Sequence, residues 1–507
     1  MRYDVSKRSV NHRLIYWQQL SGLNNTRLAA AIRERAGERG HRQVQPDARR
    51  VRAWRHGERP RDPVPELILE VLFERIGTSL TLSDIGLDGA GVERFQWDGP
   101  LLPIQTATEL ISSARSDLLV RQDITELRPS SLLAGRDLLR IVQSWTTPAA
   151  DSSSIGMSSG RKRISDQEVM QIRAVTDAFR TLDNAYGGGL TREAIIGQLL
   201  STASLIKETT YTEEVGRKLI TEVGDLATVA GWMCHDVSMH AAAQRYFLLA
   251  LQAANEADAP NLGAHVLSCM ARQAGHLGRP EDALELIHLA RYSARHTATP
   301  TMGAMLHGLE ARYYAMMGRL KDFDRAAGRA EATFADSDPG QDPAWVAYFD
   351  TSEYYATLGI CHQIAARRLG PGEASRRAID MIGRALALRQ PSRTRSRAFD
   401  QVGLARAYLA EGELDAAAAA GTTAVEITCK VSSARVRDRL CELLRETCPY
   451  EHVPAIADLR SRIHDQLAGR SLSGIRTHDL PSRPTRVLSC ATPQGRSPGL
   501  LLIQLSR

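Results

Sequence analysis

The sequence has few aromatic residues and very little lysine. Phe, Trp and Tyr make up 5% of the 507 residues, and lysine occurs at six positions among 64 basic residues, so arginine supplies most of the positive charge. Alanine, leucine, arginine and glutamate dominate instead. Because such unbranched side chains lose little rotamer freedom in a helix, this composition predicts an all-α fold. The excess of arginine over lysine is typical of a GC-rich coding sequence.

Long apolar segments are also missing. No run of 18 apolar residues occurs, and the N-terminus (MRYDVSKRSV) has no apolar signal core. We therefore expect a cytoplasmic protein with no membrane contact. The 43% hydrophobic content is enough for a buried core, which argues against a mostly disordered chain.

The motifs of common catalytic and metal sites are absent. The seven cysteines form no C-x-x-C pair, and the 14 histidines are dispersed, without an H-E-x-x-H helix. There is no G-x-S-x-G elbow or G-x-G-x-x-G turn. Gly187-Gly188-Gly189 lacks the following Gly-Lys-Ser/Thr, and we interpret it as a turn between helices with Thr191 as the next cap. The expectation is a protein with no enzymatic activity, cofactor or metal, and with reduced, buried thiols.

Charge is distributed unevenly along the chain. Residues 1–62 contain 15 Lys/Arg against 6 Asp/Glu, and residues 471–507 contain 5 against 1, although the whole chain has a net charge of only +6. The body between these segments is therefore acidic. One basic module on an acidic body indicates a nucleic-acid contact near the N-terminus.

The N-terminal segment has the pattern of several short helices. A first apolar face is followed by a second helix, TRLAAAIRERAG, with Asn24 or Asn25 as its cap. A third helix, DARRVRAWRHG, opens at Pro46 and Asp47 and stops at Gly57, and a fourth, VPELILEVLFERIG, follows Pro63. The order of these helices suggests a helix-turn-helix.

The third helix carries the candidate DNA contacts. Val51 and Trp54 are three residues apart and can face the scaffold, which leaves arginines pointing outward. Arginine on a helix inserted in the major groove can bind guanine or phosphate, and a solvated basic face is the alternative. The residues assigned to binding of double-stranded DNA are Arg27, Arg49, Arg50, Arg52, Arg55 and Arg59.

The segment VRAWRHGERPRDPVPELILEVL resembles the end of a Cro/repressor-type helix-turn-helix, and 53–87 resembles a group of streptomycete regulators. In that group a helix-turn-helix precedes tetratricopeptide repeats, and one member is a negative regulator of antibiotic production and sporulation. The resemblance extends over about residues 10–465. It implies a transcriptional regulator of secondary metabolism or development in an actinomycete. The long loop 37–45 departs from the repressor pattern, in which a tight turn is usual.

Repetition at about 40 residues follows a less patterned region. Small and large residues alternate around Ala243, Ala283 and Ala327, and again near Ala378 and Ala417. The spacing before Ala378 is longer than the others, which we attribute to the loop 367–372. Such units predict tetratricopeptide-like helix pairs stacked into a solenoid with a concave groove. The expected domains are a DNA-binding head at 1–90, connecting helices and a flexible linker at 91–164, repeats at 165–465 and a disordered, dispensable tail at 471–507.

Aromatic residues gather in one part of the repeats. They are expected either to line a groove for a protein, a peptide or a small signal, or to belong to the core. The tentative groove residues are Tyr313, Tyr314, Trp345, Tyr348 and Tyr354. The leading hypothesis is a nucleoid-associated transcriptional regulator, with repeats that bind a signal or partner or form a homodimer. The alternative is a cytosolic adaptor that assembles protein partners and binds no DNA.

Overall fold

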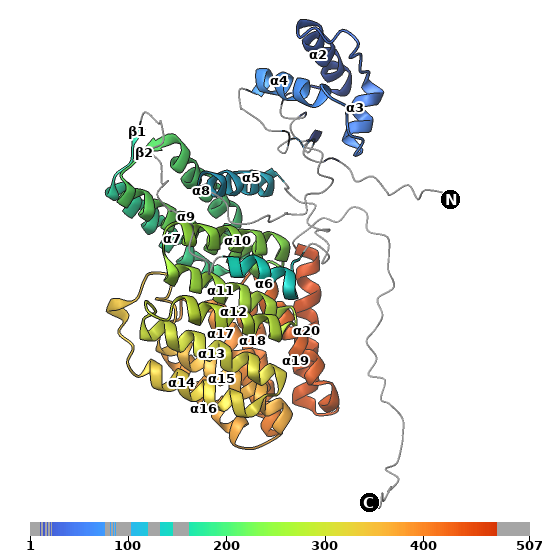
Figure 1. The fold of residues 1–507 in the computed structure, drawn as a ribbon. Helices are drawn as coiled ribbons and strands as arrows, with labels where there is room; N and C mark the ends of the chain where they lie inside the picture. The colour runs from blue at the N-terminus through green and yellow to red at the C-terminus, as the bar shows by residue number, and fades with distance from the viewer. Residues whose placement is uncertain are drawn as a thin grey trace, which may run out of the picture.

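The computed structural model describes residues 11, 14, 15, 18, 21, 23–76, 82, 85, 87, 103–119, 132–144 and 162–473. In these residues the chain is all-helical apart from two two-residue strands, as the composition predicts. Figure 1 shows a small group of helices, α2–α4, above a larger helical body. The predicted linker residues 146–161 and the tail residues 474–507 lie outside the described residues.

The small group, here called the head, contains α2 (Asn25–Glu38), α3 (Ala48–Arg55) and α4 (Val64–Ile76). As predicted, polar caps begin the first two helices: Asn24 accepts a hydrogen bond from the N–H of Arg27, and Asp47 accepts one from the N–H of Arg50. Helix α2 packs on both α3 and α4. The head has a core of its own, formed by Leu14, Leu28, Ala29, Ile32, Ala36, Val51, Trp54, Leu67, Ile68, Val71, Leu72, Ile85 and Leu87.

The body is an array of antiparallel helix pairs. The pairs that contain the predicted repeats are α9–α10, α11–α12, α13–α14, α15–α16 and α17–α18, and each packs along its length. A further pair flanks the array at each end. The bounds are α7 Asp166–Tyr186, α8 Gly188–Glu208, α9 Glu213–Asp236, α10 His240–Glu256, α11 Pro260–His276, α12 Pro280–Ser293, α13 Pro300–Met317, α14 Leu320–Phe334, α15 Thr351–Leu369, α16 Glu373–Leu388, α17 Thr394–Glu411, α18 Leu414–Thr428, α19 Ala434–Glu446 and α20 Pro454–Ser473; two 3-10 turns are η2 Pro339–Gln341 and η3 Cys448–Tyr450.

Small residues occupy the crossings within these pairs, as the repeat pattern predicts. A Cβ on Gly231 would lie 2.8 Å from the ring of Phe247, and one on Gly359 would lie 2.6 Å from Ile382. Ala243 is fully buried. Close packing of this kind requires the smallest side chain where two helices approach.

The origin of the longer fourth spacing differs from the prediction. The segment after α15 is a short turn, whereas residues 335–350, between α14 and α15, form a long connection that includes η2. Val346 and Phe349 in this connection are buried at 0% and 2% exposure. They anchor the connection on the array, so the extra residues form an ordered part of the body.

The two helices of the connecting region belong to the same body. Helix α5 (Pro103–Leu119) packs on α8 and α10, and α6 (Gly135–Ser144) packs on α12. Their apolar residues, such as Leu110 and Leu138, are part of the large core of the repeats. In addition, β1 (Lys162–Arg163) pairs in parallel with β2 (Thr209–Thr210). These elements therefore cover the repeats, and the residues between α6 and β1 lie outside the described residues.

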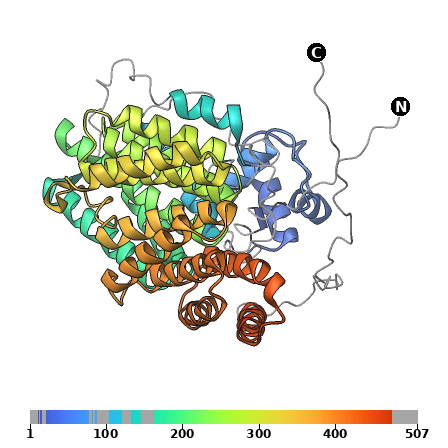
Figure 2. The ribbon, with the colours of Figure 1, turned by 90° about the horizontal axis from the view of Figure 1, so that it is seen from below.

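The array folds back until its ends meet. Figure 2 shows α13–α14 on one side of the body and α17–α20 on the other. At the closure, the N–H of Ser432 donates to the carbonyl oxygen of Tyr186 at 3.0 Å, and the Ser433 hydroxyl donates to Asp236 at 2.9 Å. The helix pairs of the solenoid thus form a ring around its concave face.

The three consecutive glycines lie at this closure. Helix α8 begins at Gly188 with Gly187 as its cap, so the assignment of Thr191 as the cap is wrong. Gly187 has a φ of +82°, which a residue with a Cβ rarely adopts. A Cβ on Gly187 would also lie 2.6 Å from the carbonyl oxygen of Ser432. The glycines permit the turn and the close approach of the two ends.

Candidate functional site

The first candidate site is the exposed face of α3 in the head. Val51 and Trp54 are 0% and 3% exposed, as predicted, so they fix the helix on the head's core. Arg49 and Arg52 lie on the opposite, solvent-exposed face and form no ion pair within the described part of the chain. This amphipathic division leaves two cations free for an external anion.

The other four assigned arginines divide into two kinds. Arg27 and Arg59 are exposed, and neither has an ion-pair partner among the described residues. Arg50 forms a salt bridge of 2.6 Å with Glu58, and Arg55 is half-buried and donates to Asn25 Oδ1 at 2.9 Å. A structural role for Arg55 is therefore visible in the head itself, because its hydrogen bond ties the end of α3 to the start of α2.

The connection between α2 and α3 is long, as the sequence indicates. It runs over residues 39–47, and Arg33 Nη1 donates to the carbonyl oxygen of Pro46 at 2.6 Å within this part of the head. Salt bridges then join α2 to α4, with Arg35 to Glu74 at 2.6 Å and Arg39 to Glu70 at 2.9 Å. These contacts fix α2 against α4.

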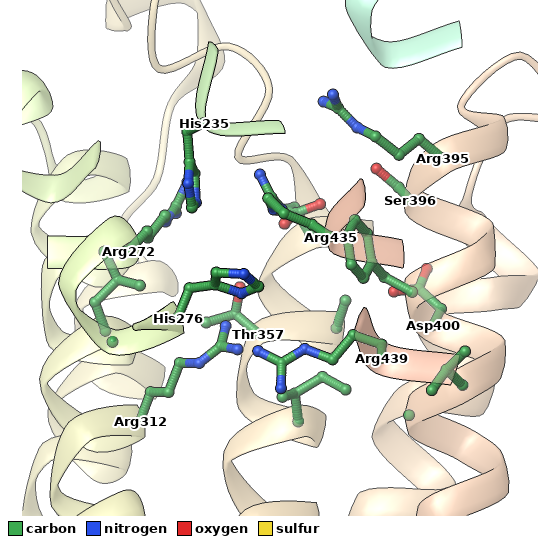
Figure 3. Close-up of a pocket in the computed structure, with 18 of the residues that line it drawn as sticks. His235, Arg272, His276, Arg312, Thr357, Arg395, Ser396, Asp400, Arg435 and Arg439 are labelled. Carbon is green, nitrogen blue, oxygen red and sulfur yellow. The ribbon is translucent and has the colours of Figure 1, made fainter. Parts of the chain in front are cut away.

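The second candidate site is a cavity of about 790 Å³ inside the ring of helix pairs. Its wall is formed by the first helix of each pair, from α7 to α19, together with the long connection before α15. Figure 3 shows side chains from these helices converging on one space. Cavities of this size are typical of small-molecule sites.

Three of the five aromatic residues assigned to the groove lie at the cavity. Tyr313, Trp345 and Tyr348 line the cavity. Tyr314 and Tyr354 do not: Arg319 lies over the ring of Tyr314 at 4.7 Å, and Tyr354 stacks on Phe334 with ring centroids 4.1 Å apart. Trp345 and Tyr348 reach the cavity because the long connection carries them there.

Arginine is the most frequent residue type in the cavity wall, which the sequence analysis missed. Twelve arginines line the cavity against five carboxylates. Most of these arginines are paired, as in the salt bridges of Arg389 with Asp400 at 2.7 Å and of Arg395 with Asp183 at 2.6 Å. Figure 3 shows Arg272, Arg312, Arg435 and Arg439 among the side chains that line this space.

A signal for this wall is present in the sequence. On five successive first helices, the residue directly after a small crossing residue lines the cavity: Trp232 after Gly231, Arg272 after Ala271, Arg312 after Ala311, Ile360 after Gly359 and Arg406 after Ala405. A small residue at the crossing points toward the second helix, so its neighbour turns toward the concave face. Aligning the repeats on their small residues predicts this row.

His235 and His276 lie at the cavity, and His240 packs beside both of them. The pKa values of His235 and His240 fit neutral rings. Burial, followed by the neighbouring His276, lowers the pKa of His240 to about 4. Burial, followed by Arg435, lowers that of His235 well below its usual range. His276 Nε2 lies 3.2 Å from Asp438. In the described residues no group of His, Cys, Asp and Glu has an arrangement that could hold a metal.

The cysteines follow the sequence expectation only in part. Cys234, Cys269 and Cys361 are buried free thiols, and burial raises the pKa of Cys269 to about 11. Cys429 is exposed, and Cys448 is disulfide-bonded. The expectation of reduced, buried thiols is therefore wrong for Cys429 and Cys448.

The comparisons with known proteins concern the head. A family model described as the SP15 N-terminal domain matches residues 14–88. This match covers the residues that form the head's core, from Leu14 to Leu87. No curated protein and no solved structure matches the chain. Among the described residues, none of the helices is both long and apolar enough to cross a membrane. The head of this chain is thus similar to the SP15 N-terminal domain.

Proposed function

We propose that this protein is a DNA-binding transcriptional regulator whose head contacts double-stranded DNA through α3. The observation that carries the proposal is the pair of exposed, unpaired arginines, Arg49 and Arg52, on a helix fixed by the buried Val51 and Trp54. A rigid helix with free guanidinium groups presents the donors that phosphates and guanine edges accept. Arg27 and Arg59, which are also exposed and unpaired, add positive charge to the head.

The resemblance to streptomycete regulators supports the biological context of this proposal. In that context the protein is a nucleoid-associated regulator of secondary metabolism or development in an actinomycete. The repeats would bind a signal or a protein partner, or form a homodimer. A ligand that prefers one curvature of the ring would change the spacing of two heads, and with it their affinity for paired half-sites.

The test combines chromatin immunoprecipitation with equilibrium binding. Tagged full-length protein is compared with the Arg49→Ala/Arg52→Ala double variant, and Arg75→Ala is the control because Arg75 is an exposed arginine on α4 of the same head. Discrete genomic sites that are lost in the double variant and retained in the control are expected. An empty profile from well-expressed protein would favour the adaptor function.

Salt dependence separates phosphate contacts from general attraction. Each neutralised phosphate contributes about −0.9 to the slope of log K against log salt concentration on duplex DNA. Arg52→Ala is expected to reduce the slope by about 1, whereas Arg75→Ala leaves it unchanged. Equal slopes for all three proteins would remove α3 as the DNA-contacting helix.

A further inference from the structure

The wall of the cavity inside the ring has more arginines than carboxylates. Among the described residues, Arg272 and Arg312 form no salt bridge with a carboxylate, and Arg435 Nη1 lies 3.7 Å from its nearest partner, Asp236. Arg439 is paired with Glu442, but Arg406 binds the same carboxylate. All four arginines are partly exposed, so an anion in the cavity can reach guanidinium groups that lack a close counter-ion of their own.

Two of these arginines face one another. Figure 3 shows Arg312, from α13, and Arg439, from α19, pointing toward each other across the cavity. Burial, followed by the charge of Arg439, lowers the pKa of Arg312. Burial also lowers the pKa of Arg435 to about 10. An anion between the two guanidinium groups would attract both of them and offset their mutual repulsion.

Several other buried polar atoms of the wall have no partner, and they are mostly hydrogen-bond donors. Gln363 Nε2, Trp345 Nε1 and the Tyr313 hydroxyl form no hydrogen bond within the described structure. All three residues line the cavity, and Gln363 and Tyr313 are each 1% exposed. Buried polar groups are normally paired, so these donors are unsatisfied as they stand. Since each atom is itself buried, it would reach an acceptor of an occupant only after a small movement of its side chain.

The geometry also limits the size of the occupant. The contacts of Asp183 and Asp236 with the far end of the array join the helix pairs in a ring around the cavity. A volume of about 790 Å³ suits a small molecule better than a long peptide. Guanidinium groups bind the oxygens of phosphate in a two-pronged manner, and several converging arginines suit several phosphates.

We infer that the cavity binds a compact small molecule with at least two phosphate groups, held between Arg272, Arg312, Arg435 and Arg439. This inference names the class of signal that the repeats would bind, and its regulatory meaning rests on the proposed function. Binding itself does not depend on DNA, so the two ideas can fail separately.

The experiment measures binding of inorganic tripolyphosphate to the full-length protein by calorimetry and by thermal unfolding, at constant ionic strength. The cavity variants are Arg312→Met and Arg272→Met, which keep an unbranched stem but remove one charge. The control is Arg325→Met, because Arg325 on α14 is 71% exposed. The Arg49→Ala/Arg52→Ala variant corrects for binding to the basic head.

Tripolyphosphate is expected to raise the melting temperature of the wild type, of Arg325→Met and of the head variant. Each cavity variant is expected to bind it at least about tenfold more weakly, because one charge-assisted contact is lost. Without ligand, Arg312→Met is expected to melt at a higher temperature than wild type, since the repulsion from Arg439 is removed. A purely structural arginine would instead lower the melting temperature.

Three results would overturn the inference. One is the absence of tripolyphosphate binding by the wild type, and another is unchanged affinity in both cavity variants. The third is binding of an acidic tetrapeptide without binding of tripolyphosphate, which would assign the cavity to a peptide. Loss of DNA binding in the head variant with retained tripolyphosphate binding would support both proposals. Loss of both in the head variant would place tripolyphosphate on the basic head and support only the regulator.

Discussion

Arg395 on α17 donates two hydrogen bonds to Asp183 on α7, at 2.8 and 2.6 Å, across 212 positions of the sequence. The two side chains are 6% and 5% exposed. Arg395 also lies 3.5 Å from Asp236, a residue that binds Ser433 on the far side of the closure. This pair joins the beginning of the helix array to its end and converts an open solenoid into a ring.

Removing the arginine of this pair is expected to open the ring. Arg395→Met leaves Asp183 buried without its main partner, which costs about 3–5 kcal/mol for a buried pair. Chemical denaturation of the full chain measures the loss, and hydrogen exchange is expected to increase in α7 and α17. In the double variant Asp183→Asn/Arg395→Met the loss is expected to be smaller than the sum of the two single losses. Strictly additive losses would show that the two residues do not act as a pair.

Two glycines of α8 are expected to respond in opposite ways to alanine. A Cβ on Gly188 would lie 2.7 Å from the carbonyl oxygen of Met233, so the backbone must shift and Gly188→Ala is expected to lose about 1–3 kcal/mol. No atom lies within 4 Å of a Cβ on Gly197. Gly197→Ala should therefore gain up to about 1 kcal/mol from helix propensity. Thermal unfolding compares the two, and stabilisation by Gly188→Ala would contradict the close approach.

Glu256 is expected to make stability depend on pH. Burial raises the pKa of this carboxyl to about 7, although hydrogen bonds from Thr106 and Gln252 oppose the shift. The unfolded chain ionises near its ordinary value of about 4.3, below the folded pKa. The contribution of Glu256 to the free energy of unfolding is therefore fully present at low pH, where the carboxyl is neutral. This contribution, up to about 3 kcal/mol, is lost as the pH rises to about 7.

The measurement is the free energy of unfolding between about pH 4.5 and pH 8, for wild type and Glu256→Gln. The variant should be more stable than wild type at the upper end and lack this part of the pH dependence. Glu285→Gln, which changes an exposed residue of α12, is the control. A constant difference between wild type and Glu256→Gln across the range would contradict the raised pKa.

Arg55 and Arg52 are expected to differ although both lie on α3. Arg55 binds Asn25, which also accepts a hydrogen bond from Gln18 at 2.9 Å, so Arg55→Ala should destabilise the head by about 1–2 kcal/mol. Arg52→Ala should leave stability unchanged and weaken DNA binding. Hydrogen exchange in α2 and α3 reports on the first effect, and fluorescence anisotropy with labelled DNA reports on the second. Faster exchange in Arg52→Ala would show that its side chain also supports the fold.

Local sequence signals predicted most of the helices. Asn24 and Asp47 begin helices as expected, because their side chains accept hydrogen bonds from free N–H groups of the first turn. The 40-residue rhythm of small residues located the helix pairs for an equally local reason. The cap assigned to Thr191 was wrong because its turn is shaped by Ser432 and Met233, which lie far away in the sequence.

The sequence alone determined an all-helical chain, the helix pairs and the amphipathic division of α3, since these depend on propensity, capping and periodicity over a few turns. Only the tertiary structure decided that the array closes, that α5 and α6 cover it and that Trp345 reaches its interior. It also decided which arginines are paired, as Arg395 is with Asp183, and which are left facing the cavity, as Arg312 is. The ring closes because small angles between successive helix pairs accumulate along the array. The salt bridges depend on side chains brought together from opposite ends of the chain, so neither feature is encoded in any short segment.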